Sequence, residues 1–495
     1  MDATAVGRQD KIPWLEELAS RSWPAHVLAV LLLASVLRLP TLAKRSLWFD
    51  EIKVALAGLQ GFEPAVRIAK AHADATPLDY LLVSASVNVF GRGEAAVRLP
   101  AAVCGLAAVA AIYFLGRAMA GPWVGLVAGL LLAISPGHVW YSQEARFYSV
   151  LMLLSIVSTL AFLVAVQRQR WYAWAAYALT VALGLYAGYQ IALVVLLHVV
   201  ALLAGGALRW WRLPAISWLH AGAALGAAAL LFLPWYVWDE TGQQYAYGAP
   251  PFRDLTMALY WVLANQAPTI TSHLPMDAPW FIWEFVLVTA LIGCGVAIWR
   301  RDALLLATSI AIVGVPLLVL LILRDQSYVF GARHMMVVVP MICLVVGYVS
   351  VQLMRVKALV PIGLVLLVGF VAMSVAGLEF QRGIEDKGED WRGAARYLRS
   401  NMAEDDRLAA FYYDVLRYYG DLGQVESVST PDEIRQFVDE TPGRAWIFTT
   451  HRQWRAPFWK DLAPVLNSDD FEETRFPGII IFVSVRDGER QAAGP

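Results

Sequence analysis

The feature that most constrains this chain is a series of apolar runs, each about as long as a membrane is thick. Crossing the hydrocarbon core of a bilayer takes roughly 20 helical residues. The chain is also 59% hydrophobic, with a mean hydropathy of +0.55, which is too apolar for an ordinary soluble surface. The sequence therefore predicts a polytopic α-helical membrane protein that lies in the lipid bilayer, with about eleven spans at residues 25–42, 97–116, 123–140, 147–166, 171–187, 189–206, 216–236, 280–299, 303–323, 335–353 and 358–377.

Basic residues in the short connectors predict the orientation of these spans. Lys and Arg near span ends are retained in the cytoplasm, and every second connector carries them, at Arg117, Arg168, Arg170, Arg209, Arg212, Arg300, Arg301, Arg355 and Lys357. Residues 1–24 then form a cytoplasmic lead-in, and loop 43–96 and tail 378–495 lie outside. We expect a multi-pass protein of the bacterial cytoplasmic (inner) membrane whose polar outer face is extracytoplasmic.

The tail after the last apolar run has the pattern of a small folded domain. Charge becomes dense from Glu379 onward, "DWRGAARYLRS" has helical spacing, and "STPDEIRQFV" opens like a capped helix. The segments "RAWIFTT" and "GIIIFVSV" have the pattern of strands. Residues 378–495 are therefore predicted to form an extracytoplasmic α/β domain.

Several function classes lack a signal in this sequence. There is no Walker sequence, GxGxxG or zinc-spaced histidine pair, which argues against nucleotide-driven chemistry. The net charge of -1 argues against nucleic acid as a partner. The cysteines stand singly inside apolar runs, at Cys104, Cys294 and Cys343, so no disulfide framework is indicated.

Polar residues gather in three segments of the predicted outer face. Asp50 and Glu51 follow the first span in "RSLWFDEIKV", "HADATPLDY" lies in the same loop, and "HVWYSQEARFY" joins spans three and four. Charge at membrane depth is costly, so such residues pair, line a wet cavity or carry out chemistry. The pattern favours an outward-facing cavity.

These segments resemble a known family. "SLWFDE", "TPLDYLLV", "GEAAVRLPAAVCGL", "ISPGHVWYSQEARFYSVLMLLS", "GARHMMVVVP" and "DWRGAARYL" are similar to the bacterial GT-C glycosyltransferases of the protein-mannosyltransferase and aminoarabinose-transferase type, the family 39-like enzymes. The resemblance implies that residues 25–377 form a GT-C-like catalytic domain. It also implies a polyprenyl-phosphate sugar as donor, used outside the cytoplasmic membrane, with inversion at the anomeric carbon.

The acidic pair is the predicted catalytic group. The resemblance assigns Asp50 the role of the base that accepts the proton of the attacking hydroxyl, which a carboxylate within hydrogen-bond reach can do. Glu51 points the other way on a helix and is expected to orient a basic partner or a metal ion. The alternative is a solvated acidic cap at a helix N-terminus.

Three arginines are candidates for the donor phosphate, because the guanidinium fork bonds phosphate oxygens in pairs. Arg146 in "YSQEARFY" is the first choice, followed by Arg333 and Arg38. For Arg146 the alternative is an ion pair that closes the turn. For Arg333 and Arg38 it is an arginine that snorkels to the interface.

Four further residues are candidates for binding substrate or acceptor: Glu144, Asp79, His72 and Tyr141. Asp79 departs from the apolar or aromatic residue usual in the family, and His72 has the alternative of an ordinary solvated loop residue. The metal requirement is left open, with a divalent ion as the candidate cofactor.

The sequence thus predicts a glycosyltransferase that moves a sugar from a polyprenyl-phosphate donor to a hydroxyl of a glycolipid, lipopolysaccharide or cell-envelope polysaccharide. The alternative is a transporter or flippase for a lipid-linked glycan. A transporter is expected to carry ionisable groups near the bilayer midplane, whereas here they lie near the outer ends of the spans.

The orientation can be tested with reporter fusions. A periplasm-active reporter fused after Pro495 should be active and the same reporter fused after Arg301 should be silent, because basic connectors stay inside. The reverse pattern would place Asp50 in the cytoplasm and contradict the assignment of the outer face.

Overall fold

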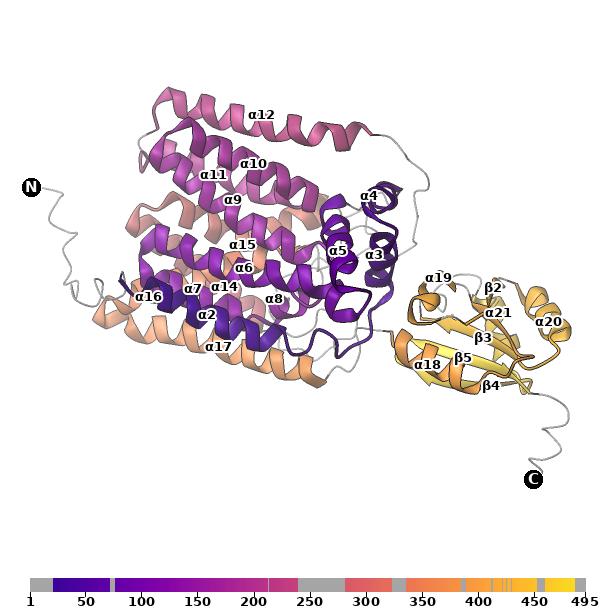
Figure 1. Cartoon of the computed structure of the whole chain (residues 1–495). Helices are drawn as coiled ribbons and strands as arrows, with labels where there is room; N and C mark the ends of the chain where they lie inside the picture. Colours follow the sequence, from indigo (N-terminus) through magenta and orange to yellow (C-terminus); the bar gives the residue numbers. More distant parts are fainter. Residues whose placement is uncertain are drawn as a thin grey trace, which may run out of the picture.

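The computed structural model describes residues 21–71, 76–211, 213–238, 281–322, 335–383, 389–410, 413–420, 422–423, 425–428, 430–451 and 459–485. Each predicted apolar run coincides with one helix in this part of the chain, except 123–140, which forms two. These helices pack side by side as a bundle (Figure 1): α2 (Trp23–Arg38), α6 (Glu94–Ala120), α7 (Pro122–Ile134), α9 (Tyr148–Arg168), α10 (Trp171–Ala187), α11 (Ile191–Ala207), α12 (Ala215–Val237), α14 (Phe281–Arg300), α15 (Ala303–Ile322), α16 (Val338–Met354) and α17 (Val360–Gly383).

The multi-pass character follows from the length and composition of these helices. Within the described ranges, four segments are long and apolar enough to cross a membrane by themselves: 94–120, 148–168, 215–237 and 357–383, the last including the short 3-10 turn η3 (Lys357–Leu359). Several of the other apolar helices are shorter, among them α2, α7, α11 and α16. The count of eleven spans therefore stays a prediction.

The predicted run 123–140 is divided in the structure. Helix α7 ends at Ile134, Ser135 is extended with φ -61° and ψ 119°, and the short helix α8 (Pro136–Tyr141) begins at the next residue. Proline lacks an N–H and disfavours helical backbone in the residue before it, so the break falls at Pro136. The last carbonyls of α7 then need partners from outside the helix.

The predicted outer loop 43–96 is folded into three helices that precede α6. They are α3 (Phe49–Leu59), α4 (Phe62–Ala71) and α5 (Pro77–Phe90). Helices α3 and α5 approach so closely that a Cβ at Gly58 would lie 3.0 Å from Ser84 Cα, and the Ser84 hydroxyl donates to the Gly58 carbonyl at 2.9 Å. Their contact fixes the direction of α3, which carries the acidic pair.

The C-terminal domain is a five-stranded mixed sheet with helices, as the tail sequence predicts. Strand order is β2-β1-β3-β5-β4, with β1 parallel to β2 and β3 and with β5 antiparallel to β3 and β4. The predicted capped helix is α20, where Thr430 and Glu433 form a capping box. The bounds are α18 (Trp391–Asn401), β1 (Arg407–Ala410), α19 (Tyr413–Leu416), η4 (Arg417–Tyr419), β2 (Val425–Glu426), α20 (Pro431–Glu440), β3 (Ala445–Thr450), α21 (Trp459–Leu466), β4 (Phe471–Phe476) and β5 (Ile479–Ser484).

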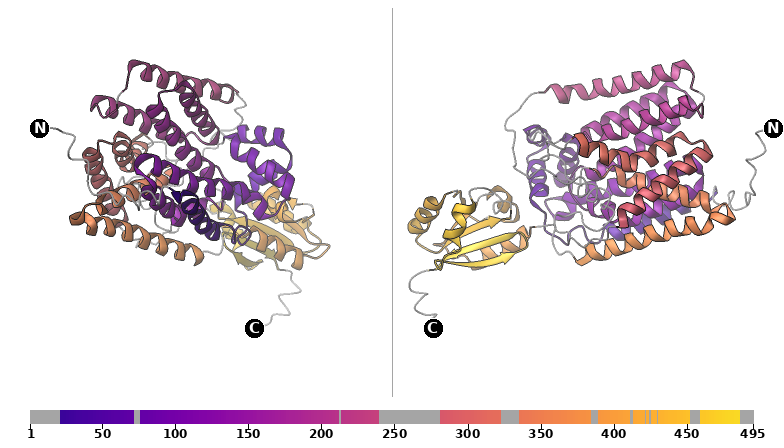
Figure 2. Two further views of the ribbon diagram at one scale, coloured as in Figure 1. Left: turned by 60° about the vertical axis from the view of Figure 1, so that its left-hand side comes forward. Right: turned by 180° about the vertical axis from the view of Figure 1, so that it is seen from behind.

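The C-terminal domain packs on the loop helices. Figures 1 and 2 place α3, α4, α5 and this domain at the same end of the bundle. One hydrophobic cluster joins them, because buried side chains of α3 and α5 contact those of α18, β1, β3 and β5. The acidic pair at the start of α3 therefore lies where bundle, loop helices and C-terminal domain meet.

Candidate functional site

The first turn of α3 is built around its unpaired backbone amides. Trp48 is extended, with φ -89° and ψ 169°, and α3 begins at Phe49. The N–H groups of a first helical turn have no partner inside the helix, and acids there favour the helix dipole. Glu51 turns back and accepts the Trp48 N–H at 3.2 Å. Asp50, one residue earlier and half-buried, faces a different neighbourhood.

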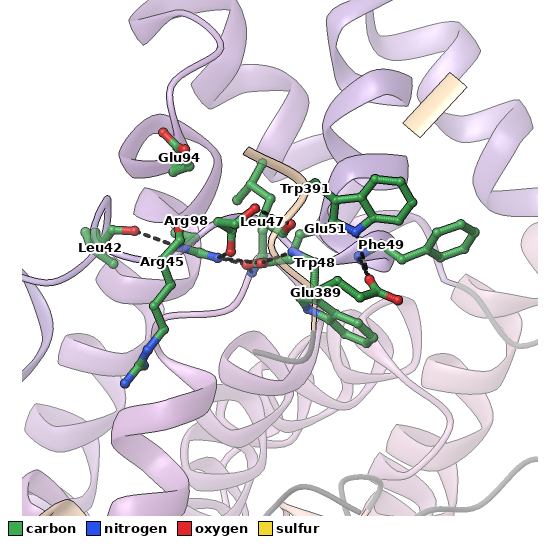
Figure 3. A network of polar contacts seen from close by, with 12 residues as sticks. Leu42, Arg45, Leu47, Trp48, Phe49, Glu51, Glu94, Arg98, Glu389 and Trp391 are labelled. Carbon is green, nitrogen blue, oxygen red and sulfur yellow. Dashed lines mark hydrogen bonds and ion pairs between the residues drawn. The ribbon is translucent and has the colours of Figure 1, made fainter. Parts of the chain in front are cut away.

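Glu51 and Arg98 form a fully buried ion pair at the centre of this junction (Figure 3). The Arg98 Nη2 lies 2.6 Å from Glu51 Oε2, its Nε lies 2.8 Å from Oε1, and the two side chains are 1% and 0% exposed. Arg98 also donates to the carbonyls of Leu42, Arg45 and Ser46 at 2.8 to 2.9 Å. All five of its N–H groups are thereby used.

The Glu51 carboxylate also reaches the turn between α8 and α9, because the Ala145 N–H donates to its Oε1 at 2.9 Å. Glu51 was predicted as a member of the catalytic pair. Its oxygens accept hydrogen bonds from a guanidinium and two backbone amides, a geometry that suits a carboxylate orienting a basic partner. It ties together α3, α6 and the turn that carries Arg146.

Arg146 brings two predicted residues together. Its guanidinium interacts with the carboxylates of Asp50 on α3 and Asp79 on α5, and with the hydroxyls of Tyr80 and Tyr148. Burial lowers the pKa of Arg146, but these neighbours raise it well above its usual value. Its Nε is buried without a hydrogen-bond partner among the described residues. A permanent cation with an unused N–H donor thus interacts electrostatically with two acids.

Asp79 is the second acid of this cluster and is 4% exposed. The Tyr80 N–H donates to its Oδ1 at 3.0 Å. Burial raises the pKa of Asp79 to about 6, while Arg146 and the backbone amides of Tyr80 and Phe147 act in the opposite direction. An acid with this pKa can exchange its proton near neutral pH, which is typical of functional sites.

Arg38 has a different role from the predicted phosphate contact. Its Nη1 donates to the Ala133 carbonyl at 2.9 Å, and its Nη2 lies 3.4 Å from the Leu132 carbonyl and 2.6 Å from His138 Nδ1. These carbonyls belong to the last turn of α7, which ends before Pro136, and the Leu132 carbonyl also accepts the Ser135 N–H at 3.3 Å. Because α7 is broken there, Arg38 is used to cap it and is fully buried.

Two substrate candidates are buried near the Arg146 cluster. Glu144 is 4% exposed and acts electrostatically on Arg98. Tyr141 is 2% exposed and packs against Tyr148, with ring centroids 4.5 Å apart. Both therefore support the turn that carries Arg146. The remaining predicted site residues, His72 and Arg333, lie outside the described residues.

Sequence reasoning assigned no role to Arg98. The signal was present, since an arginine that opens an apolar run in "GEAAVRLPAAVCGL" is costly to bury unless it is paired. As for metal binding, no group of three or more His, Cys, Asp or Glu side chains comes together in the part of the chain that the structure describes. The described cluster around Arg146 consists of two acids, one arginine and two tyrosines.

Known structures resemble this chain in fold across nearly its whole length. The crystal structure of ArnT from Cupriavidus metallidurans in the apo state matches with a TM-score of 0.59 at 14% identity, covering 96% of this chain and 100% of that one. ArnT bound to undecaprenyl phosphate matches with a TM-score of 0.56 at 14% identity and the same coverage. The oligosaccharyltransferase AglB from Archaeoglobus fulgidus, in complex with an inhibitory peptide and a dolichol-phosphate, gives 0.51 at 12% identity, covering 96% of this chain and 75% of that one.

The sequence comparison agrees over one segment. Residues 74–238 match the family of dolichyl-phosphate-mannose-protein mannosyltransferases, while no curated protein matches the chain. The bundle, the loop helices and the small C-terminal domain thus have the fold of the ArnT and AglB structures, and together with the family match this supports the resemblance found in the sequence.

Breaking the buried pair tests its structural role. Arg98→Met should lower the free energy of unfolding by about 3–5 kcal/mol, because Glu51 would be left as an uncompensated buried charge. The matched control is Arg67→Met, which breaks an exposed pair with Glu63 and should cost at most about 1 kcal/mol. Equal destabilisation of the two variants in bicelles would contradict the role given to Arg98.

Proposed function

We propose that this protein is a membrane glycosyltransferase that moves a sugar from a polyprenyl-phosphate donor to a hydroxyl of a lipid or glycan acceptor. The observation that carries the proposal is the meeting of Asp50 and Arg146, which come from two separate sequence motifs, around one buried cluster. An acid and a fixed cation at one place suit a reaction in which a proton is lost and an anion departs.

In the proposed step, the acceptor oxygen attacks the anomeric carbon of the sugar. The bond between that carbon and the phosphate oxygen breaks, and its electron pair stays on the phosphate. The acceptor proton passes to the Asp50 carboxylate as the new bond forms. Direct displacement of this kind inverts the configuration at the anomeric carbon.

Arg146 is the proposed partner of the phosphate. A lipid phosphate leaves with additional negative charge, and a preorganised guanidinium meets that charge without reorganising water. Its fork can bond two phosphate oxygens. In the described cluster Asp50 contributes to balancing Arg146, so a bound phosphate would compete for the guanidinium and leave Asp50 available as the base.

Asp79 is the proposed contact for substrate hydroxyls. It lies on α5 beside Arg146, and its raised pKa lets the carboxyl group donate or accept a hydrogen bond near neutral pH. Family resemblance does not predict an acid at this position. We therefore assign Asp79 to the choice of sugar or acceptor and leave the transfer step to Asp50.

The similar structures support this choice of donor. ArnT was crystallised with undecaprenyl phosphate, and AglB was determined with a dolichol-phosphate. A flippase is the alternative, but the acids of the described cluster come from the loop helices and its arginine comes from the turn before α9. We propose that this end of the bundle faces the extracytoplasmic side of the inner membrane, where lipid-linked sugars are presented.

The proposal is tested by transfer assays with purified protein, polyprenyl-phosphate sugars and envelope lipid acceptors. Asp50→Asn should leave folding and donor binding nearly unchanged and lower turnover by about a hundredfold or more, the usual scale of acid-base help. Asp432→Asn, a change on the exposed surface of α20, is the matched control and should turn over like the parent. Parent-like turnover by Asp50→Asn would remove Asp50 from the mechanism.

A further inference from the structure

A third carboxylate, supplied by the C-terminal domain, lies at the start of α3. Glu389 is 1% exposed and lies two residues before the start of α18. Its Oε2 accepts the backbone N–H of Phe49 at 2.9 Å and the indole N–H of Trp391 at 2.9 Å, while Oε1 lies 3.5 Å from His451 Nδ1 (Figure 3). A buried acid is therefore held between α3 and β3.

The backbone N–H of Phe49 lies in the first turn of α3 and therefore has no acceptor within the helix. The amide before it, of Trp48, is accepted by Glu51 on the same helix. The Phe49 N–H instead donates to Glu389, which lies 340 residues further along the chain. The backbone on the N-terminal side of Asp50 is thus fixed by two carboxylates, one from α3 and one from the C-terminal domain.

The packing around Glu389 makes its contact with the start of α3 rigid. Trp391 is fully buried and stacks on Phe448 of β3 with centroids 5.2 Å apart, and its ring lies 6.4 Å from that of Phe49. The Leu47 N–H donates to the Tyr419 hydroxyl at 2.6 Å. Residues 47 and 49 are both hydrogen-bonded to the same domain, so the segment entering α3 has little freedom to move.

We propose that Glu389 is a positioning residue for the transfer reaction. It fixes the first turn of α3 from the C-terminal domain and thereby sets the placement of Asp50 opposite Arg146. The domain then serves as an internal support of the active site. This inference rests on the proposed function, and it gives the C-terminal domain a task that sequence motifs did not indicate. Small displacements of a reacting group lower turnover more than they lower binding.

The test compares three variants of the full-length protein in nanodiscs. Glu389→Ala removes the acceptor and should speed hydrogen exchange at residues 47–51, lower kcat by about ten- to a hundredfold and leave the donor KM within about twofold of the parent value. Glu389→Gln keeps an oxygen for the two N–H groups and should restore both protection and most of kcat. Glu426→Ala, which breaks the ion pair with Arg407 elsewhere in the domain, should change neither.

The outcomes separate this inference from the proposed function. If the parent protein transfers no sugar, the function fails, and the exchange of residues 47–51 still tests the contact made by Glu389. If the parent is active and Glu389→Ala keeps the parent kcat, the positioning role is overturned. A loss of activity that Glu389→Gln fails to rescue also overturns it, since the carboxylate would then act through its charge. Unchanged hydrogen exchange at residues 47–51 in Glu389→Ala would also overturn the positioning role.

Discussion

The buried ion pair between Glu51 and Arg98 is the interaction on which the rest of the site depends. Two full charges out of water are tolerated only when each has its hydrogen bonds satisfied, and here every Arg98 donor is used. The partners belong to the segment after α2, the first turn of α3 and the turn before α9. Arg98 bonds the segment after α2 and Glu51, and Glu51 accepts the Ala145 N–H, so the ion pair holds together the parts of the chain that carry Asp50 and Arg146.

Three acids lie at or beside one helical turn, and their surroundings separate their roles. Glu51 and Glu389 accept backbone and side-chain N–H groups and are fully buried. Asp50 is half-buried and faces Arg146, with Asp79 on the neighbouring helix. The N-terminus of α3 favours negative charge. The hydrogen bonds made by Glu51 and Glu389 give these two carboxylates a structural role. Glu51 and Glu389 support the turn, and Asp50 is the acid proposed to react.

The sequence could predict what depends on local pattern. Apolar length located the bundle helices, a capping box located α20, and short apolar segments located β3 and β5. The sequence could not predict contacts between residues that lie far apart in the chain. Pro136 ends α7, and Arg38 donates to a carbonyl of its last turn, a contact that no local pattern indicates. Asp50 and Arg146 were each singled out, but only packing of α3 and α5 against the α8–α9 turn joins them. Glu389 carried no local signal because its partner is Phe49.

The central claim is that the Asp50, Asp79 and Arg146 cluster receives a lipid phosphate. The most direct measurement is a cryo-EM structure of the protein in nanodiscs with undecaprenyl phosphate. The account predicts phosphate oxygens at hydrogen-bond distance, about 2.7–3.2 Å, from the Arg146 guanidinium, with Asp50 adjacent and Arg38 still bonded to the end of α7. A phosphate bound away from Arg146, with the guanidinium unchanged between Asp50 and Asp79, would contradict it.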